Sequence, residues 1–383
     1  MVALTNPAGL TNYVTAVHGR DRAPVKILVI DDSTGEGTAA TTFLDRWQYL
    51  LQQGLRANLP TPNIVTPGIG YIPALTVPLS PAPPVTTSGS PGTHYGEHGL
   101  GMKRYRVDNT QYVQWNAQQC DAVRIHYGKS TVAGSAIISI DAVDQTPQPS
   151  SAAGANGDGF YWDSPALTPG SHTVKVRGTS AFSFVLEACE FYNGDKDAGI
   201  RVYDSAHYGA TSTTLLTANA DFGQWQAVAA LKPQLIIYGM GLNDLAGGYA
   251  AYLTNVDTTL SKIATAMGTN PYSVLLFSKY RPVKSTLVDP VNWAAMQEGL
   301  RTRATGFISH YNLQEDWPVL QAGGATSAGL MYESDYPLHP NSAGHARIAS
   351  LLTQALTPTF AALPAGSYLD GQSYAYIPRK EPV

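Results

Sequence analysis

Charged residues are scarce in this sequence, at only 14% of its 383 residues. Soluble domains usually carry about 25%. The net charge is −4 and lysine and arginine form no run, so a nucleic-acid partner is not expected. Apolar residues nevertheless reach 44%, which is enough for a packed core and excludes a largely disordered chain.

Cysteine is almost absent as well. The two cysteines, Cys120 and Cys189, belong to no Cys-x-x-Cys or Cys/His spacing, so we expect no metal site built on them. Both fall in one β-rich stretch, which leaves two alternatives open: a single disulfide, or two buried thiols.

Long apolar runs are missing too. None approaches the roughly 20 residues that span a bilayer, so no membrane span is expected. The N-terminal MVALTNPAGLTNY has no basic start followed by an apolar run, so no signal peptide is recognised. A weakly charged surface rich in Thr, Ser and Asn suits an extracellular or virion-associated protein, but neither compartment nor oligomeric state is fixed.

The first part of the chain has the pattern of an α/β fold. Residues 25–30 (VKILVI) form a short apolar run typical of a strand buried on both faces. A glycine-containing turn, DDSTGEG, follows, and then an apolar helical face is predicted at Phe43, Trp47, Leu50, Leu51 and Leu55. The chain length itself suggests about two domains.

The middle of the chain differs in texture. Residues 60–92 are rich in Pro, Gly, Thr and Ser, which predicts a long connector. Short alternating segments such as YVQWN, AVRIHYG and HTVKVRG then follow one another up to about residue 192. Their turn spacing predicts an inserted antiparallel β-sandwich, jelly-roll-like, over residues 88–193.

After residue 194 the α/β pattern returns. Buried strands are predicted at 235–241 and 273–278, and helices at 211–218, 247–267, 291–304 and 342–356. The predicted fold class is therefore α/β with a central parallel sheet, interrupted by the sandwich. Residues 1–87 and 194–383 would form the two parts of the α/β domain.

Ser33 is the first residue with a chemical signal. It lies just past the carboxyl end of the first strand, where open α/β sheets place their ligand sites. Gly35 and Gly37 allow a tight turn and close backbone approach. The competing interpretation is that Ser33 only caps the following helix.

His339 supplies a base that could act with this serine. It stands in DYPLHPN before the last helix, and Asp335 precedes it by four residues. A carboxylate beside a histidine holds the ring tautomer and stabilises the imidazolium while the ring accepts a proton. Asn243, in GLND after another strand, offers a neutral amide donor, and Gly209, in HYGATS, an unobstructed backbone N–H.

In this order, the blocks IDDSTGEG, HYGATS, GLND and DYPLHPN resemble the SGNH (GDSL-like) hydrolase family, whose signature residues are Ser, Gly, Asn and His. The resemblance covers residues 25–57 and about 195–356. It implies a three-layer α/β fold and serine esterase chemistry without a metal or organic cofactor. The sandwich lies between the first two blocks and is not explained by it.

By this resemblance, Ser33 would attack an ester carbonyl while His339 takes its proton, and Asp335 would orient His339. The oxyanion hole would consist of the N–H groups of Ser33 and Gly209 and the amide of Asn243. The sequence departs from the family in two places. Asp31 stands where the family has glycine, and the acid lies four residues before the histidine instead of three, with Glu333 a less favoured substitute.

Four aromatic residues of the sandwich are candidate carbohydrate contacts: Tyr112, Trp115, Tyr161 and Trp162. The alternative for each is that it fills the sandwich core.

The leading hypothesis is an esterase that removes short acyl groups, such as O-acetyl, from a polysaccharide or cell-envelope glycan. A lipid esterase is a variant of the same chemistry. The competing hypothesis is a non-catalytic carbohydrate-binding or structural protein, such as a phage tail or cell-surface module with a decayed hydrolase fold.

Overall fold

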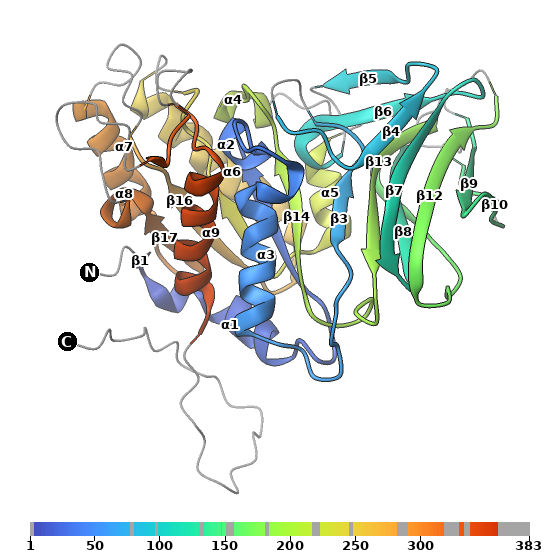
Figure 1. Ribbon diagram of the computed structural model, residues 1–383. Helices are drawn as coiled ribbons and strands as arrows, with labels where there is room; N and C mark the ends of the chain where they lie inside the picture. The colour runs from blue at the N-terminus through green and yellow to red at the C-terminus, as the bar shows by residue number, and fades with distance from the viewer. Residues whose placement is uncertain are drawn as a thin grey trace, which may run out of the picture.

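The computed structural model describes residues 4–76, 80–95, 99–129, 134–146, 148–150, 157–180, 184–216, 223–244, 248–281, 290–317, 329–332 and 338–358. In these residues an α/β domain lies beside an antiparallel β-sandwich, as Figure 1 shows. The predicted fold class is confirmed.

The α/β domain is built on a six-stranded sheet. Its order is β1 (Leu4–Thr5), β17 (Ile308–Asn312), β16 (Ser273–Ser278), β15 (Leu235–Tyr238), β2 (Val25–Asp31) and β14 (Ile200–Ala206). All neighbours are parallel except β1, which runs antiparallel to β17. Every residue of β2 but Lys26 is buried, as the apolar run predicts.

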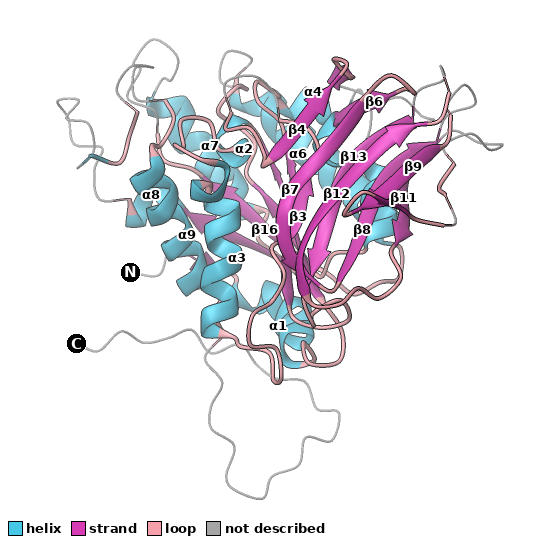
Figure 2. Ribbon diagram, turned by 45° about the vertical axis from the view of Figure 1, so that its right-hand side comes forward, coloured by secondary structure: helices cyan, strands magenta, loops and turns pink. Residues whose placement is uncertain are grey.

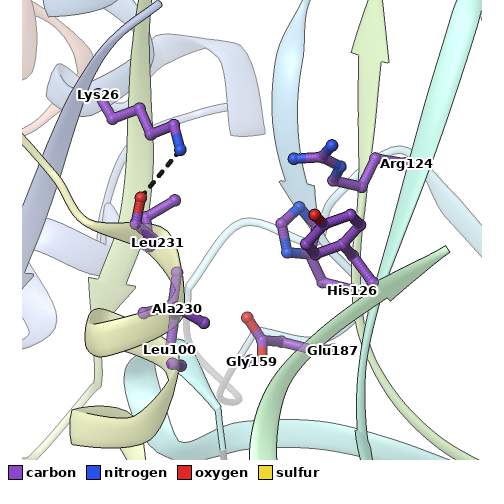
Figure 3. Close-up of a pocket in the computed structure, with 10 residues that line it drawn as sticks. Lys26, Leu100, Arg124, His126, Gly159, Glu187, Ala230 and Leu231 are labelled. Carbon is purple, nitrogen blue, oxygen red and sulfur yellow. Dashed lines mark hydrogen bonds between the residues drawn. The ribbon is translucent and has the colours of Figure 1, made fainter. Parts of the chain in front are cut away.

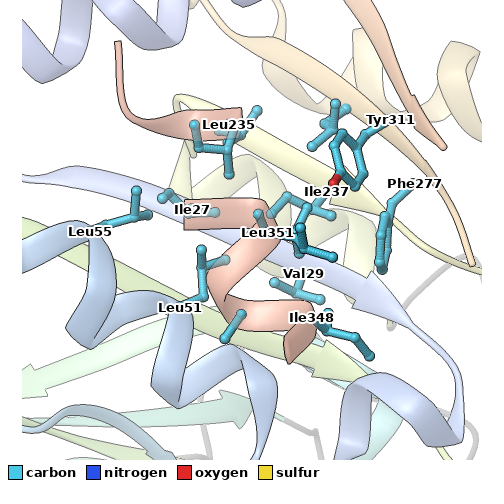
Figure 4. Packing of buried hydrophobic residues seen from close by; sticks show 14 of the residues in the cluster. Ile27, Val29, Leu51, Leu55, Leu235, Ile237, Phe277, Tyr311, Ile348 and Leu351 are labelled. Atoms are coloured by element: carbon cyan, nitrogen blue, oxygen red, sulfur yellow. The ribbon is translucent and has the colours of Figure 1, made fainter. Parts of the chain in front are cut away.

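Helices cover both faces of this sheet. On one face, Ile27 and Val29 pack with α1 (Thr11–His18), α3 (Trp47–Asn58) and α9 (Ser342–Leu356), as Figure 4 shows in part. On the other, Leu28 and Ile30 pack with α5 (Gln224–Leu231), α6 (Tyr249–Met267) and α7 (Pro290–Thr302). Successive β2 residues thus alternate between two apolar layers, the three-layer arrangement of α/β folds.

The sandwich consists of two antiparallel sheets, visible in Figure 2. One has the order β10 (Val143–Asp144), β9 (Ala136–Ile140), β12 (Gly170–Gly178), β7 (Tyr112–Cys120) and β4 (Val85–Ser88). The other has β11 (Gly157–Asp163), β8 (Ala122–Lys129), β13 (Phe184–Tyr192), β6 (Lys103–Val107) and β5 (Gly92–Tyr95). Alternating residues of both sheets share one apolar core.

The predicted connector over 60–92 is wrong in part. It contains β3 (Gly70–Pro73), which is buried throughout and pairs with β13, and also β4, which pairs with β7. Pro73 at the end of β3 does not interrupt this pairing, since the N–H of the next residue, Ala74, still donates to the carbonyl of Glu187 at 2.8 Å. The division of the chain at residues 87/88 and 193/194 stays a prediction.

The first predicted helix begins later than its apolar pattern suggests. Phe43 lies in a short 3₁₀ turn, η2 (Phe43–Asp45), closed by a capping box between Thr42 and Asp45. Extended backbone at Arg46 then separates this turn from α3. Leu50 is only half-buried, whereas Leu51 and Leu55 are in the core.

The two cysteines are free thiols buried in the sandwich core, Cys120 on β7 and Cys189 on β13. Burial raises the pKa of Cys120 to about 12, so this thiol stays protonated at neutral pH. None of the described helices is long and apolar enough to cross a bilayer.

Candidate active site

Ser33 begins the four-residue helix α2 (Ser33–Glu36), directly beyond β2. The cap of this helix is Asp32, whose side chain accepts the N–H of Thr34 at 3.0 Å. Ser33 is therefore not the N-cap, and its hydroxyl is free for another contact. Gly37 ends the helix at φ +89°, a left-handed conformation that favours glycine.

That contact is with His339. The Oγ of Ser33 and the Nε2 of His339 lie 2.8 Å apart, although 306 residues separate them in the chain. Both residues are almost buried, with 4% and 5% of their surface exposed. A hydroxyl within hydrogen-bond reach of an imidazole is the arrangement in which histidine can activate a serine.

The loop that carries His339 is held at several points. The backbone carbonyl of His339 accepts the N–H of Tyr332 at 2.9 Å. The carbonyl of the preceding residue, Leu338, accepts the Tyr280 hydroxyl at 2.8 Å. Asn341 then caps α9. Asp335 and Glu333, the predicted orienting acids, lie outside the described residues.

The other two signature residues lie on loops that flank β2. Gly209 follows β14 on one side, where the N–H of His207 donates to the Asp31 carbonyl at 3.0 Å. Asn243 follows β15 on the other side, where the N–H of Leu242 donates to Asp32 Oδ2 at 3.3 Å. The chain passes from β14 to β15 across β2, so this edge is a topological switch point.

These two loops meet at the carboxyl end of β2. The side-chain amide of Asn243 donates to the carbonyl of Ala210 at 2.9 Å. Gly209 has φ +73°, and a Cβ built on it would meet nothing within 4 Å, so open space lies beside its backbone. The structure therefore brings the four sequence blocks to one place.

Asp31, the residue that replaces the family's glycine, is wholly buried and ion-paired. Its Oδ1 lies 2.6 Å from the ammonium of Lys279, which also pairs with Asp32. Gly35 accommodates it, since a Cβ there would lie 2.3 Å from the Cβ of Asp31. Burial raises the pKa of Asp31 to about 8 against the pull of Lys279, and Asp32 adds to the rise.

A second buried cluster lies at the other end of α2. The ammonium of Lys103, at the start of β6, is 3.2 Å from both Glu36 Oε1 and Asp204 Oδ2. Arg46 lies 2.9 Å from the same Asp204 oxygen. Burial is unfavourable to the Asp204 carboxylate, but Lys103 and Arg46 outweigh it and lower its pKa.

Sequence reasoning missed several of these residues. Lys279 had a usable signal, because a lysine directly after the apolar run SVLLFS stands at the carboxyl edge of a parallel sheet. Tyr208 and Lys103 had no such signal. The ring of Tyr208 stacks on His339, with the ring centroids 6.3 Å apart.

Two of the four candidate carbohydrate contacts are wrong. Trp115 is fully buried and Trp162 is 8% exposed, and both fill the sandwich core. Tyr112 is half-buried. Only Tyr161 of the four is well exposed, at 53%, with the guanidinium of Arg124 3.9 Å from its ring centre.

A cavity of about 90 Å³, open to solvent, lies between the two domains and is shown in Figure 3. Lys26 and Leu231 line one side, Arg124 and His126 the other. Lys26 is the second residue of β2, so the cavity lies toward the opposite end of the strand from Ser33, and neither Ser33 nor His339 lines it. Among the described residues, no group of three or more His, Cys, Asp or Glu side chains could hold a metal ion.

The chain matches no protein-family model and no curated protein sequence. Its structure is similar to a solved peptidoglycan O-acetylesterase, with a TM-score of 0.70 and 18% sequence identity over 92% of this chain and 98% of the other.

Weaker likenesses are a two-domain esterase active on acetylated mannans (TM-score 0.45, 13% identity, 93% of this chain and 54% of the other) and a family 3 carbohydrate esterase of Clostridium thermocellum (TM-score 0.39, 13% identity, 86% and 93%). The comparison with the peptidoglycan O-acetylesterase covers both domains. The chain therefore has the fold of the SGNH hydrolases, with an inserted antiparallel β domain.

Proposed function

We propose that the protein is a serine esterase that removes short acyl groups, such as O-acetyl, from a polysaccharide or cell-envelope glycan. The observation that carries this proposal is the 2.8 Å contact between Ser33 Oγ and His339 Nε2 at the carboxyl edge of the sheet. The likeness to a peptidoglycan O-acetylesterase supports the substrate class. A glycan of the envelope would place the enzyme outside the cytoplasm or on a virion.

In this mechanism the Ser33 oxygen attacks the acyl carbon as its proton passes to His339 Nε2. The N–H groups of Ser33 and Gly209 and the amide of Asn243 would stabilise the oxyanion, each donor contributing about 3 kcal/mol. The protonated His339 then donates to the leaving sugar oxygen. Water, deprotonated by His339, releases acetate from the acyl-enzyme, and Asp335 keeps its predicted role of orienting the ring.

The competing hypothesis, a binding protein with a decayed site, rested in part on Asp31. The Lys279 partner and the space left by Gly35 weaken that argument, because they accommodate the substitution. Tyr161, exposed on the sandwich, remains a candidate sugar contact.

The test is acetate release from O-acetylated peptidoglycan and from acetylated polysaccharides, compared with 4-nitrophenyl acetate, butyrate and octanoate. We expect acetyl esters to be cleaved at least about tenfold faster than octanoyl esters, and Ser33→Ala to remove the activity. A preference for octanoate would favour the lipid esterase. Equal activity in the Ser33→Ala variant would refute the proposed nucleophile.

A further inference from the structure

We infer that Lys103, a residue of the β-sandwich, is a positioning residue for the oxyanion turn, which we define as residues 207–210. This inference rests on the proposed function, since it assigns the sandwich a role in the same active site. The turn contains Gly209, the proposed backbone donor. The chain of contacts from Lys103 to this turn runs through one carboxylate.

Lys103 reaches out of the sandwich and into the α/β domain. Its side chain is 1% exposed, and its ammonium donates to the carbonyl of Ala206 at 2.9 Å as well as to Glu36 and Asp204. Ala206 is the last residue of β14, immediately before the oxyanion turn. The ammonium therefore contacts the residue immediately before that turn.

Glu36 continues the chain of contacts. While its Oε1 accepts from Lys103, its Oε2 accepts the backbone N–H of Tyr208 at 2.6 Å. Tyr208 immediately precedes Gly209, and Glu36 belongs to the same four-residue helix as Ser33. One carboxylate therefore fixes the oxyanion turn relative to the nucleophile, and Lys103 supplies the cation that keeps this carboxylate in place.

Gly101 provides a second hydrogen-bonded contact with the same turn. Its carbonyl accepts the Nδ1–H of His207 at 2.7 Å, and its N–H donates to the Ser205 hydroxyl at 2.9 Å. A Cβ at Gly101 would lie 2.8 Å from the carbonyl oxygen of Ala206, so only glycine fits this close approach. The segment 99–103 is thus shaped to the backbone around the turn.

This arrangement matters because oxyanion donors act only when they are preorganised. A misplacement of about 1 Å can lower a rate about a hundredfold. Without Lys103, the Oε1 of Glu36 would lose the ammonium that it contacts, and the carboxylate could turn away from its present position. That movement would weaken its hydrogen bond to the Tyr208 N–H, and Gly209 would move with its neighbour.

The experiment compares Lys103→Met, the conservative Lys103→Arg and the control Arg56→Met in the full chain. Arg56, on α3, forms a partly buried ion pair with Asp195, 3.2 Å away, on the segment after β13. Within the described residues, none of its side-chain hydrogen bonds is with a residue of the turn. We expect Lys103→Met to lower kcat on 4-nitrophenyl acetate about ten- to hundredfold per folded molecule, with KM within about twofold. Lys103→Arg should recover part of the loss, and Arg56→Met should keep kcat within about twofold.

Hydrogen exchange followed by mass spectrometry is the second measurement, because it needs no substrate. The peptide over residues 206–211 should exchange faster in Lys103→Met than in the wild type or in Arg56→Met. If Lys103→Met does not fold, the double variant Lys103→Met/Glu36→Gln removes both charges and leaves Asp204 paired with Arg46. It should fold, with faster exchange in the same peptide.

The two proposals fail in different ways. A wild-type protein without esterase activity would refute the proposed function, while exchange over 206–211 still decides the role of Lys103. Wild-type kcat and wild-type exchange in the folded Lys103 variants would overturn the inference and leave the esterase untouched. Equal losses of kcat in Lys103→Met and Arg56→Met would also overturn it, since they would indicate general destabilisation.

Discussion

Two buried lysines contact the two ends of helix α2, and their surroundings differ in charge balance. Lys279 faces two carboxylates, Asp31 and Asp32, just before Ser33. Lys103 also faces two carboxylates, but Arg46 joins it as a second cation. With every group ionised, the first cluster would therefore have one more negative charge than positive, whereas the second would be neutral.

The difference shows in how the carboxylates titrate. Burial raises the pKa of Asp31 to about 8, because one ammonium does not neutralise two buried carboxylates. In the neutral cluster the two cations outweigh burial and lower the pKa of Asp204. We conclude that Asp31 in the first cluster takes up a proton near neutral pH, while Asp204 in the second stays ionised and serves as a fixed support.

Among the variants that compare the two clusters, Lys279→Met should lower the free energy of unfolding most. It removes the ammonium that pairs with the buried Asp31 and Asp32. Removing one partner of a buried ion pair lowers the free energy of unfolding by about 3–5 kcal/mol. Urea unfolding at pH 7 measures it. We expect a larger loss than for Lys103→Met, where Asp204 keeps Arg46. A loss below about 1 kcal/mol for Lys279→Met would contradict this interpretation.

The same substitution placed in each cluster should have unequal effects. Asp204→Asn leaves two cations with one carboxylate and should lower the free energy of unfolding by about 3 kcal/mol. Asp31→Asn restores one carboxylate per ammonium and mimics the protonated Asp31, so at pH 7 it should stay within about 1 kcal/mol of the wild type. Urea unfolding of both variants provides the comparison, and equal losses would show that the charge balance does not differ.

The pH dependence of stability sharpens the contrast further. Between the ordinary Asp pKa of 3.8 and the folded value of about 8, Asp31 is protonated in the folded state and ionised in the unfolded state. Folding then takes up a proton, so the free energy of unfolding falls as pH rises through this window. Asp31→Asn should be more stable than the wild type at pH 9 by about 1 kcal/mol or more.

Unfolding curves at pH 5, 7 and 9 measure this difference. Burial also raises the pKa of Glu187, to about 7, and that carboxyl produces a slope of the same sign in both proteins. The contribution of Asp31 is therefore the difference between the two curves. Parallel curves would contradict the assignment of this proton to Asp31.

The smallest expected effect is a difference in stability between alanine substitutions at two glycines near the oxyanion turn. Gly209→Ala should lower stability by only about 1–2 kcal/mol, since φ is +73° but its Cβ would meet no atom within 4 Å. Gly101→Ala should lower stability more, because its Cβ would also collide with the carbonyl of Ala206. Thermal unfolding ranks the two variants, and the reverse order would show that segment 99–103 does not fit closely.

Much of the α/β fold could be predicted from local patterns. The run VKILVI is β2, and the predicted helix 342–356 is α9 (Ser342–Leu356). Buried parallel strands and amphipathic helices reveal themselves in consecutive residues, because each element alone satisfies its backbone or forms an apolar face. Helix α5 was missed because it has only eight residues and a weak apolar face, and β3 because a proline-rich stretch surrounds it.

The candidate site could be predicted only where a family motif marks it. Ser33 and His339, 306 residues apart, were paired by resemblance and not by any local pattern. Lys279 contacts Asp32, 247 residues away in the sequence, and Lys103 contacts Glu36, 67 residues away. Such contacts depend on how strands and domains come together in space, which residue spacing does not encode.

The most direct test of the central claim, that His339 activates Ser33, is labelling with a fluorophosphonate followed by peptide mass spectrometry. The account predicts one adduct per chain, located on Ser33, formed by the native protein and lost in His339→Ala. Failure of the native protein to form an adduct on Ser33, or equal labelling of Ser33 in the His339→Ala variant, would contradict it.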